Sequence, residues 1–152
     1  MKKVILKLEL LICFLIATLF LASTAKGDDE KIFNDAIQYT VEISTRIEIP
    51  FSGEEQGAFS GAGFLIDKKR GWILTNAHVV AISPSVSKIA FFEHVFQLAK
   101  KVYVDAFIDI AILKIPPTEI PDTAKEAILE CGSIPSIGHP VGAFGHPWGY
   151  SF

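Results

Sequence analysis

Cysteine is scarce in this chain of 152 residues, which contains only Cys13 and Cys131. Cys13 lies within an apolar run near the N-terminus, Leu10–Leu21, and removal of that run as part of a leader leaves Cys131 alone. A single cysteine forms no internal disulfide. The sequence therefore predicts a fold that is held together by its hydrophobic core.

An excess of positive charge is also absent. The chain has 14 lysine and arginine residues against 17 aspartate and glutamate residues, and its formal net charge is −3. Proteins that bind DNA or RNA usually carry a strong positive excess. The charge balance therefore argues against nucleic acid as a partner.

The sequence also lacks the usual signs of a cofactor or metal site. It has no phosphate-binding loop of the P-loop type, and the glycines between Gly57 and Gly63 are better explained by strand entry and close backbone approach. No two of the potential ligands His78, Cys131, His139 and His146 show the close spacing of zinc ligands. We expect no cofactor and no metal.

The N-terminus has the pattern of a secretory signal. A basic start, Met1–Lys3, precedes the apolar run Leu10–Leu21, and the small residues Ala22–Ala25 offer a cleavage site after Ala25. We therefore expect an exported protein, periplasmic or secreted. The alternative is a tether to the inner membrane by the uncleaved leader. Lys7 and Glu9 argue against it, because they interrupt the apolar run and leave it short for a membrane span. Contact with a membrane is expected only in that case.

The region after the leader predicts an all-β fold. Residues 41–49 alternate between apolar and polar side chains, with Val41, Ile43, Thr45, Ile47 and Ile49 on one face. Five further short runs have turn signals between them, at residues 61–67, 71–76, 86–92, 95–104 and 109–115. Six short strands of this spacing suit a Greek-key barrel or a sandwich, and residues 28–39 predict a short helix before it.

His78 follows an apolar strand, Trp72–Leu74, which is entered through a charged turn. We expect the side-chain oxygens of Thr75 and Asn76 to cap a helical turn that begins near Ala77. A histidine at such a rigid junction is suited to act as a general base. The alternative is a core histidine with a satisfied hydrogen bond.

Asp109 lies in the apolar segment 106–115. A carboxylate buried there needs a partner, and a histidine ring N–H is a natural one because it also fixes the orientation of the ring. The alternative is that Asp109 has no catalytic role and bonds to its own turn at the start of a strand. Taken together, His78 and Asp109 are two members of a hydrolytic triad.

Four stretches resemble the trypsin-like serine proteases, and within them the HtrA/Deg family. Leu74–Val80 resembles the histidine signature of the family, and Asp109–Lys114 resembles its aspartate signature. Gly61–Asp67 resembles the strand that precedes the histidine, and Val141–Gly149 resembles the segment that opens the second barrel. His146 stands where the family usually has asparagine.

The resemblance implies a Ser-His-Asp endopeptidase with a trypsin-like barrel, in which His78 is the general base and Asp109 orients it. It implies unfolded or damaged proteins as substrates, as in protein quality control. In the resembled family an N-terminal segment can help to build trimers, so a homotrimer is a further expectation. The expected organisation is a signal peptide over 1–25, a complete first barrel with the helix over 26–115, and a linker with a truncated second barrel over 116–152.

The nucleophile of the resembled family is missing from this sequence. Ser133, Ser136 and Ser151 do not lie in a Gly-x-Ser-x-Gly turn, and Ser60 precedes the histidine instead of following the aspartate. The three members of a triad act as a unit, so we expect this chain to be an inactive N-terminal fragment. The alternative is a non-catalytic, exported binding module with a protease-like barrel.

Overall fold

The computed structural model describes residues 30–51 and 53–145 of the chain. The predicted signal peptide and His146 lie outside these residues. Two units are distinguished, Met1–Asp35 and Ala36–Phe152, and the second contains every strand of the described part. Residues 30–39 are helical, which confirms the predicted short helix. Within the described residues, no helix is long and apolar enough to span a membrane.

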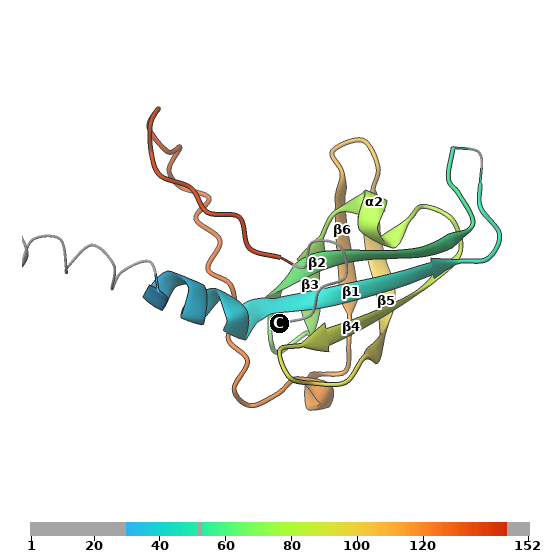
Figure 1. The fold of residues 1–152 in the computed structure, drawn as a ribbon, viewed down its shortest axis with the longest axis horizontal. Helices are drawn as coiled ribbons and strands as arrows, with labels where there is room; N and C mark the ends of the chain where they lie inside the picture. Colours follow the sequence, from blue (N-terminus) through green and yellow to red (C-terminus); the bar gives the residue numbers. More distant parts are fainter. Residues whose placement is uncertain (1–29, 52, 146–152) are drawn as a thin grey trace, which may run out of the picture. The chain divides into compact units, whose positions relative to one another are not determined.

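Six strands form a closed antiparallel barrel in the spatial order β1-β2-β3-β6-β5-β4 (Figure 1). The predicted all-β barrel is confirmed. A one-turn helix, α2, follows β3, and a short 3-10 helix, η1, follows β6. The elements are β1 (Thr40–Ile47), β2 (Gly57–Asp67), β3 (Trp72–Thr75), α2 (Ala77–Val80), β4 (Ser85–Phe91), β5 (Gln97–Asp105), β6 (Ile110–Lys114) and η1 (Pro117–Glu119).

The barrel interior is filled by the inward side chains of alternating positions, as the period of a strand requires. The fully buried large side chains include Ile43, Leu65, Ile73, Ile89 and Leu113. The two polar side chains of one cross-strand pair, Thr45 and Ser87, are also buried, and their hydroxyl oxygens lie 3.0 Å apart in a hydrogen bond. Pairing the two hydroxyls avoids the cost of an unsatisfied polar group in the core.

Two strand boundaries differ from the prediction, the end of β1 and the start of β2. Ile49 was expected on the buried face, but β1 ends at Ile47 and the Ile49 side chain is 74% exposed. Pro50 follows, and a proline has no N–H with which to continue the ladder. β2 begins at Gly57, earlier than expected, because Gly57 pairs with Ile47.

Two glycines allow close approaches that a larger residue would prevent. A Cβ atom at Gly61 would lie 2.6 Å from Cγ1 of Val79, so α2 packs directly on β2. Gly71 has φ +69° in the β2–β3 turn, and a Cβ there would lie 2.1 Å from the carbonyl oxygen of Ile115. The prediction of close backbone approach in the Gly57–Gly63 stretch is confirmed at Gly61.

The segment after β6 forms no strand between residues 116 and 145. Its first part packs against the barrel, where Ile120 and Ala124 are buried. The backbone N–H of Ala127 donates to the carbonyl oxygen of Leu65 at 2.7 Å. The predicted strands of a second barrel are therefore not formed in the described part of this segment, and the proposed domain boundary at residue 116 stays a prediction.

Candidate active site

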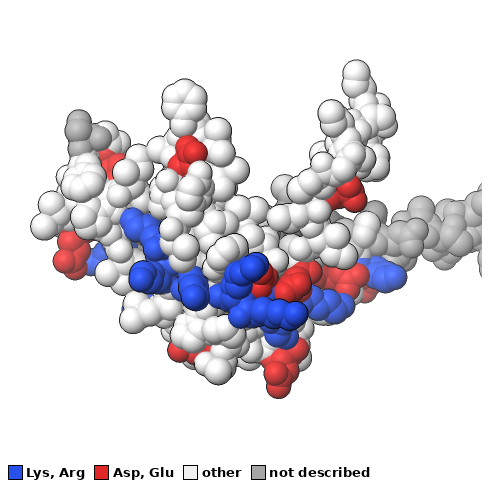
Figure 2. Space-filling view, turned by 180° about the vertical axis from the view of Figure 1, so that it is seen from behind, with Lys and Arg blue, Asp and Glu red and all other residues white. Residues whose placement is uncertain are grey.

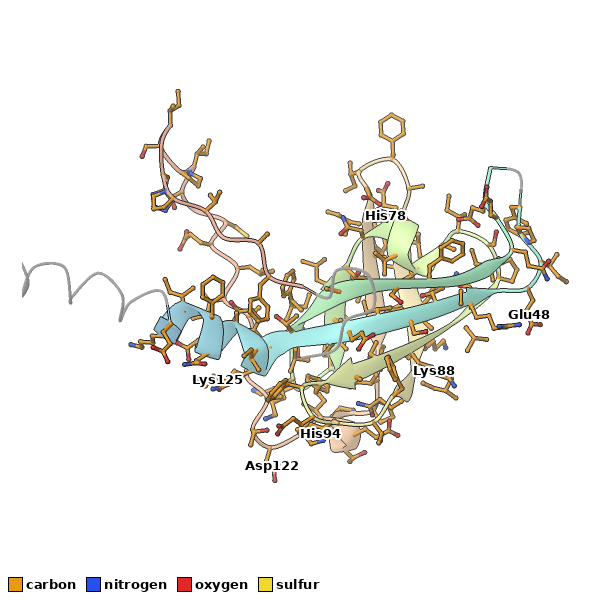
Figure 3. The ribbon with its side chains drawn as sticks, in the orientation of Figure 1. Glu48, His78, Lys88, His94, Asp122 and Lys125 are labelled. Carbon is orange, nitrogen blue, oxygen red and sulfur yellow. The ribbon has the colours of Figure 1, made fainter. Side chains whose placement is uncertain are left out.

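The pairing of β3 with β6 brings the two predicted site residues together. The strands are antiparallel, and Thr75 at the end of β3 is the partner of Ala111 near the start of β6. The residues that leave β3 therefore lie beside the residue that enters β6. His78 is carried by α2 and Asp109 immediately precedes β6, and Figure 3 shows His78 at the end of the barrel where α2 lies.

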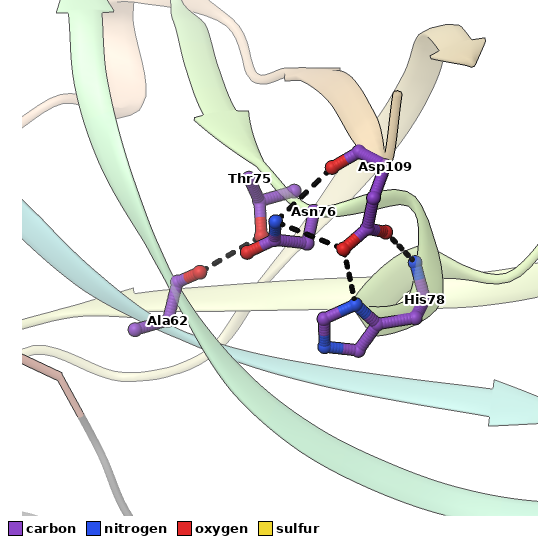
Figure 4. Close-up of polar contacts among 5 residues, drawn as sticks. All are labelled: Ala62, Thr75, Asn76, His78 and Asp109. Atoms are coloured by element: carbon purple, nitrogen blue, oxygen red, sulfur yellow. Dashed lines mark hydrogen bonds and ion pairs between the residues drawn. The ribbon is translucent and has the colours of Figure 1, made fainter. Parts of the chain in front are cut away.

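The His78 and Asp109 side chains are in direct contact. Nδ1 of the imidazole lies 2.7 Å from Oδ2 of Asp109, and the backbone N–H of His78 donates to Oδ1 at 3.0 Å (Figure 4). One carboxylate thus holds both the ring and the backbone of the histidine. The contact predicted between these two residues is present.

Asn76 is a third member of the site, which the sequence analysis had placed elsewhere. Its Nδ2 donates to the backbone oxygen of Asp109 at 3.0 Å and to Oδ2 at 3.1 Å. The predicted capping is wrong, because Asn76 makes no side-chain bond to the helix and the Thr75 hydroxyl donates to the carbonyl of Ala62 at 2.8 Å. The Asp109 carboxylate accepts the orphan N–H of His78 instead.

Asp109 was expected to be buried, and this prediction is wrong. The residue lies in the turn before β6 with φ +55°, and its side chain is 45% exposed. The backbone N–H of His78, then the His78 ring and the Asn76 amide, hold the pKa of the Asp109 carboxyl below its usual range. The carboxyl is therefore ionised at neutral pH, and its charge faces the imidazole.

The geometry leaves one ring nitrogen of His78 available for proton transfer. An ionised carboxylate is only an acceptor, so Nδ1 carries the proton in the contact with Asp109. In the neutral ring, Nε2 then has the free lone pair, and it faces away from Asp109 (Figure 4). The side chain of His78 is 71% exposed. This arrangement can take a proton from a hydroxyl that approaches Nε2.

Lys101 fixes the loop that follows α2. Its ammonium group donates to three backbone carbonyls of this loop, those of Val80 at 3.4 Å, Ala81 at 2.9 Å and Ser83 at 2.7 Å. Ala81 has φ +62°, a left-handed conformation that is unfavourable for a residue with a side chain. The three bonds compensate for this strain and satisfy carbonyls at the end of α2.

Glu54 holds the same loop from the opposite side. Its carboxylate accepts the N–H of Ile82 at 2.7 Å, the N–H of Ser83 at 2.8 Å and the Ser83 hydroxyl. Burial acts to raise the pKa of Glu54, but these hydrogen bonds outweigh it and the pKa is lowered. Burial lowers the pKa of Lys101, and the charge of Glu54 opposes that shift. The sequence analysis did not find this pair, because the two residues are distant in the sequence.

Among the candidate residues that the structure describes, His94, His139, Ser60, Ser133 and Ser136 make no contact with His78 or Asp109. His94 is exposed in the connection between β4 and β5, and Ser60 lies on β2, paired with Ser44. His139, Ser133 and Ser136 are exposed in the segment after β6. Across residues 30–51 and 53–145, no three His, Cys, Asp or Glu side chains are grouped as metal ligands would be.

Comparison with known proteins matches residues 61–152 to the family described as trypsin-like peptidase domain. The chain is 33% identical over 135 residues to the putative mitochondrial protease Do-like 3 of Arabidopsis thaliana, a match that covers 83% of this chain and 23% of that protein. It is 27% identical over 120 residues to the pro-apoptotic serine protease NMA111 of Saccharomyces cerevisiae, with coverage of 79% and 12%. The chain thus spans under a quarter of either relative.

A solved structure, that of the serine endoprotease from Yersinia pestis, shares the fold. It superposes with a TM-score of 0.50 at 24% sequence identity, and the match covers 70% of this chain and 36% of that one.

Proposed function

Because the chain belongs to the trypsin-like serine peptidase family, with HtrA-like proteases among its relatives, we propose that His78 and Asp109 are its catalytic base and orienting acid. The observation that carries this proposal is the 2.7 Å contact between Nδ1 of His78 and Oδ2 of Asp109. The activity they serve is hydrolysis of peptide bonds by acyl transfer to a serine. The fold alone would not distinguish a peptidase from a binding protein.

In the proposed mechanism, Nε2 of His78 accepts the proton of the attacking serine hydroxyl and later gives it to the leaving amine. Asp109 holds the ring in the tautomer that leaves Nε2 free, and its negative charge stabilises the imidazolium that forms. Asn76 keeps the carboxylate in place through its bonds to Oδ2 and to the Asp109 backbone. The roles of Asp109 and Asn76 are supported by contacts that are already formed in this chain.

The proposal assigns no nucleophile within these 152 residues. The sequence contains no serine in a glycine-rich turn of the kind that exposes a nucleophile and builds an oxyanion hole. Loss of the nucleophile costs about as much activity as loss of the whole triad. We therefore expect the 152-residue chain to hydrolyse no peptide bonds by itself. The same observation supports the alternative, a non-catalytic binding module that keeps His78 and Asp109 as relics.

Substrates, location and assembly are extensions of this proposal. Unfolded or damaged proteins are the proposed substrates, in keeping with the HtrA-like resemblance. The basic start and apolar run at the N-terminus support export to the periplasm or medium, or a tether by the uncleaved leader. A homotrimer is proposed from the same resemblance.

The first experiment treats the purified chain with a serine-reactive phosphonate and measures hydrolysis of casein. Neither hydrolysis nor a labelled serine is expected. A labelled serine together with hydrolysis would show that the nucleophile had been overlooked.

The second experiment tests His78 where a nucleophile is supplied. The chain is fused after residue 145 to the second half of an active trypsin-like peptidase that carries its own serine. His78→Ala should abolish hydrolysis and labelling, whereas His139→Ala, which removes an exposed histidine outside the site, should retain both. Hydrolysis that survives His78→Ala would overturn the assignment of His78 as the base.

A further inference from the structure

The outer surface of the barrel over β3 to β6 carries unpaired lysines beside apolar side chains. Lys88, Lys100 and Lys114 are exposed at outward positions of β4, β5 and β6. Figure 2 shows lysine and arginine side chains gathered in a band across the face seen from behind. We name as the basic face the residues Trp72, Lys88, Leu98, Lys100 and Lys114, which the strand register connects.

The register of this face places like charges against one another. Lys100 and Lys114 are direct partners across β5 and β6, an arrangement that disfavours folding through charge repulsion. Within the described residues, no hydrogen bond or ion pair holds the ammonium group of Lys88, Lys100 or Lys114. A surface that keeps two lysines in register, with a third on the neighbouring strand and no anionic partner for any of them in the described part of the chain, is suited to a ligand of opposite charge.

Apolar side chains lie between these lysines. Leu98 is the partner of Lys88 and is 65% exposed, and Trp72 is the partner of Lys114. The guanidinium of Arg70 lies 4.9 Å from the Trp72 ring centroid and is paired with the Asp67 carboxylate. A hollow of about 530 Å³ opens beside Lys100 and Lys114, lined also by Val102, Ile115 and Pro116. The face therefore combines cations with aliphatic and indole groups.

This combination matches a lipid surface better than an acidic protein. Lysines are point charges that attract diffuse negative charge, whereas recognition of individual carboxylates favours the fork of arginine. Aliphatic groups and tryptophan gain by entering the boundary between headgroups and acyl chains. If the leader stays uncleaved, its apolar run Leu10–Leu21 supplies a second signal, and membrane attachment is stable when two signals act together.

We propose that the basic face binds the phosphate headgroups of an anionic lipid surface. The lysines neutralise the phosphates, and Leu98 and Trp72 enter the interfacial layer. This activity is independent of peptide hydrolysis, because none of these residues contacts His78 or Asp109.

Vesicle binding by the full chain tests the charge dependence. Binding to vesicles of phosphatidylglycerol and phosphatidylcholine is compared with binding to phosphatidylcholine alone. The triple variant Lys88→Gln, Lys100→Gln, Lys114→Gln should lose about 100-fold in partition onto the anionic vesicles, because each lysine near such a surface contributes about fivefold. The matched control Lys31→Gln, Arg46→Gln, Lys125→Gln removes three charges outside the basic face and should lose far less. Equal losses would overturn the proposal.

Fluorescence of Trp72 separates this face from the apolar N-terminal run. The chain has two tryptophans, so Trp148→Phe leaves Trp72 as the only one. Its emission should be quenched by vesicles that contain phosphatidylglycerol and brominated lipid, and the three lysine substitutions should remove the quenching. Bound protein with unquenched Trp72 would overturn the proposal. If the chain binds an acidic peptide but does not bind anionic vesicles, the proposal is overturned and the face is assigned to a protein partner. Circular dichroism confirms that each variant is folded.

Discussion

Asp109 is the residue at which the polar contacts of the candidate site converge. Its carboxylate accepts bonds from the His78 backbone, the His78 ring and the Asn76 amide, while its own backbone holds φ +55°. Aspartate tolerates this left-handed conformation better than most residues with a side chain, and its short side chain brings the carboxylate back to α2. The left-handed backbone and the need for a carboxylate beside His78 therefore both favour aspartate at position 109.

Asp109→Asn should release the His78 ring from its fixed tautomer. The two N–H groups of His78 bond to different carboxylate oxygens, and in asparagine one of these positions becomes an NH2 donor, so one of the two bonds loses its acceptor. Nitrogen-15 NMR of the imidazole should show a single protonated Nδ1 in the wild-type chain and a mixture of tautomers in the variant. Asp67→Asn, which alters a carboxylate bonded to Arg70 in the β2–β3 turn, is the control. An unchanged spectrum for Asp109→Asn would remove Asp109 from its orienting role.

The lowered pKa values of the acidic side chains predict how stability depends on pH. The pKa is held down at Asp109 mainly by the His78 backbone N–H, at Asp105 by the Ile108 N–H and at Asp67 by the Arg70 N–H. The unfolded chain then binds protons more readily than the folded one. The stabilisation is complete above the ordinary aspartate pKa of about 3.9 and is lost as the pH falls below it.

Urea unfolding between pH 7 and pH 2 measures this dependence. The free energy of unfolding should be steady at neutral pH and should fall below about pH 4. Asp109→Asn should be less stable at pH 7 and should lose less stability on acidification, because one of the titrating groups is gone. A variant that loses as much stability on acidification as the wild type would contradict the assigned shift at Asp109.

At the residue scale, the sequence was sufficient to predict the contact between His78 and Asp109 but not the contacts of their neighbours. The two residues lie in local motifs whose chemistry requires a pair. The partner of Asn76, by contrast, depends on the register of β3 against β6, which local sequence does not specify. The exposure of Asp109 was missed for a related reason, because apolar neighbours in the sequence do not show that the residue occupies a turn.

Among the elements, the loop after α2 is held by charges from two other parts of the barrel. Lys101 lies on β5 and Glu54 lies between β1 and β2, and together they bond three carbonyl groups and two N–H groups of residues 80–83. These bonds restrain the end of α2, the helix that carries His78. A loop held in this way adds rigidity to the site without contacting it.

Lys101→Met should loosen this loop. The methionine keeps an apolar stem of similar length but leaves the carbonyls of Ala81 and Ser83 without the Lys101 donor, at a cost of about 1–2 kcal/mol for a partly solvated site, whereas Val80 keeps its bond from the Ser85 hydroxyl. Hydrogen exchange of the amides of residues 81–83 should accelerate. Lys100→Met, the outward-facing neighbour, should leave both stability and exchange unchanged or slightly improved, because it relieves the repulsion from Lys114. Equal exchange rates in the two variants would show that Lys101 does not restrain the loop.

The elements themselves were largely predictable from alternation. All six strands were expected, and most boundaries are correct within two residues, because each strand buries one face and exposes the other. Lys101 shows the limit of this approach. In the sequence it is one of two adjacent lysines, and only the bulge in β5 next to it decides which of the two turns toward the loop.

For the molecule as a whole, the question is whether the segment after β6 folds together with the barrel. Ile120 and Ala124 belong to the same hydrophobic cluster as the inward residues of the strands. The N–H of Lys125 donates to the carbonyl oxygen of Gln38 and that of Ala127 to the carbonyl oxygen of Leu65, so the segment is bonded to the last turn of the N-terminal helix and to β2. The contacts up to residue 127 indicate one cooperative unit within Ala36–Phe152.

Ile120→Ala tests this cooperativity. Ile120 is 7% exposed, and its truncation should cost about 2–4 kcal/mol through lost burial and a residual cavity. Ile128→Ala changes a residue that is 93% exposed a short distance along the same segment and should stay within about 0.5 kcal/mol of the wild type. If the segment and barrel unfold together, Ile120→Ala lowers the midpoint of a single transition seen by both circular dichroism and tryptophan fluorescence. Two separate transitions, or an unchanged midpoint, would show that the cooperative unit ends at β6 and that residues 116–127 do not unfold together with the barrel.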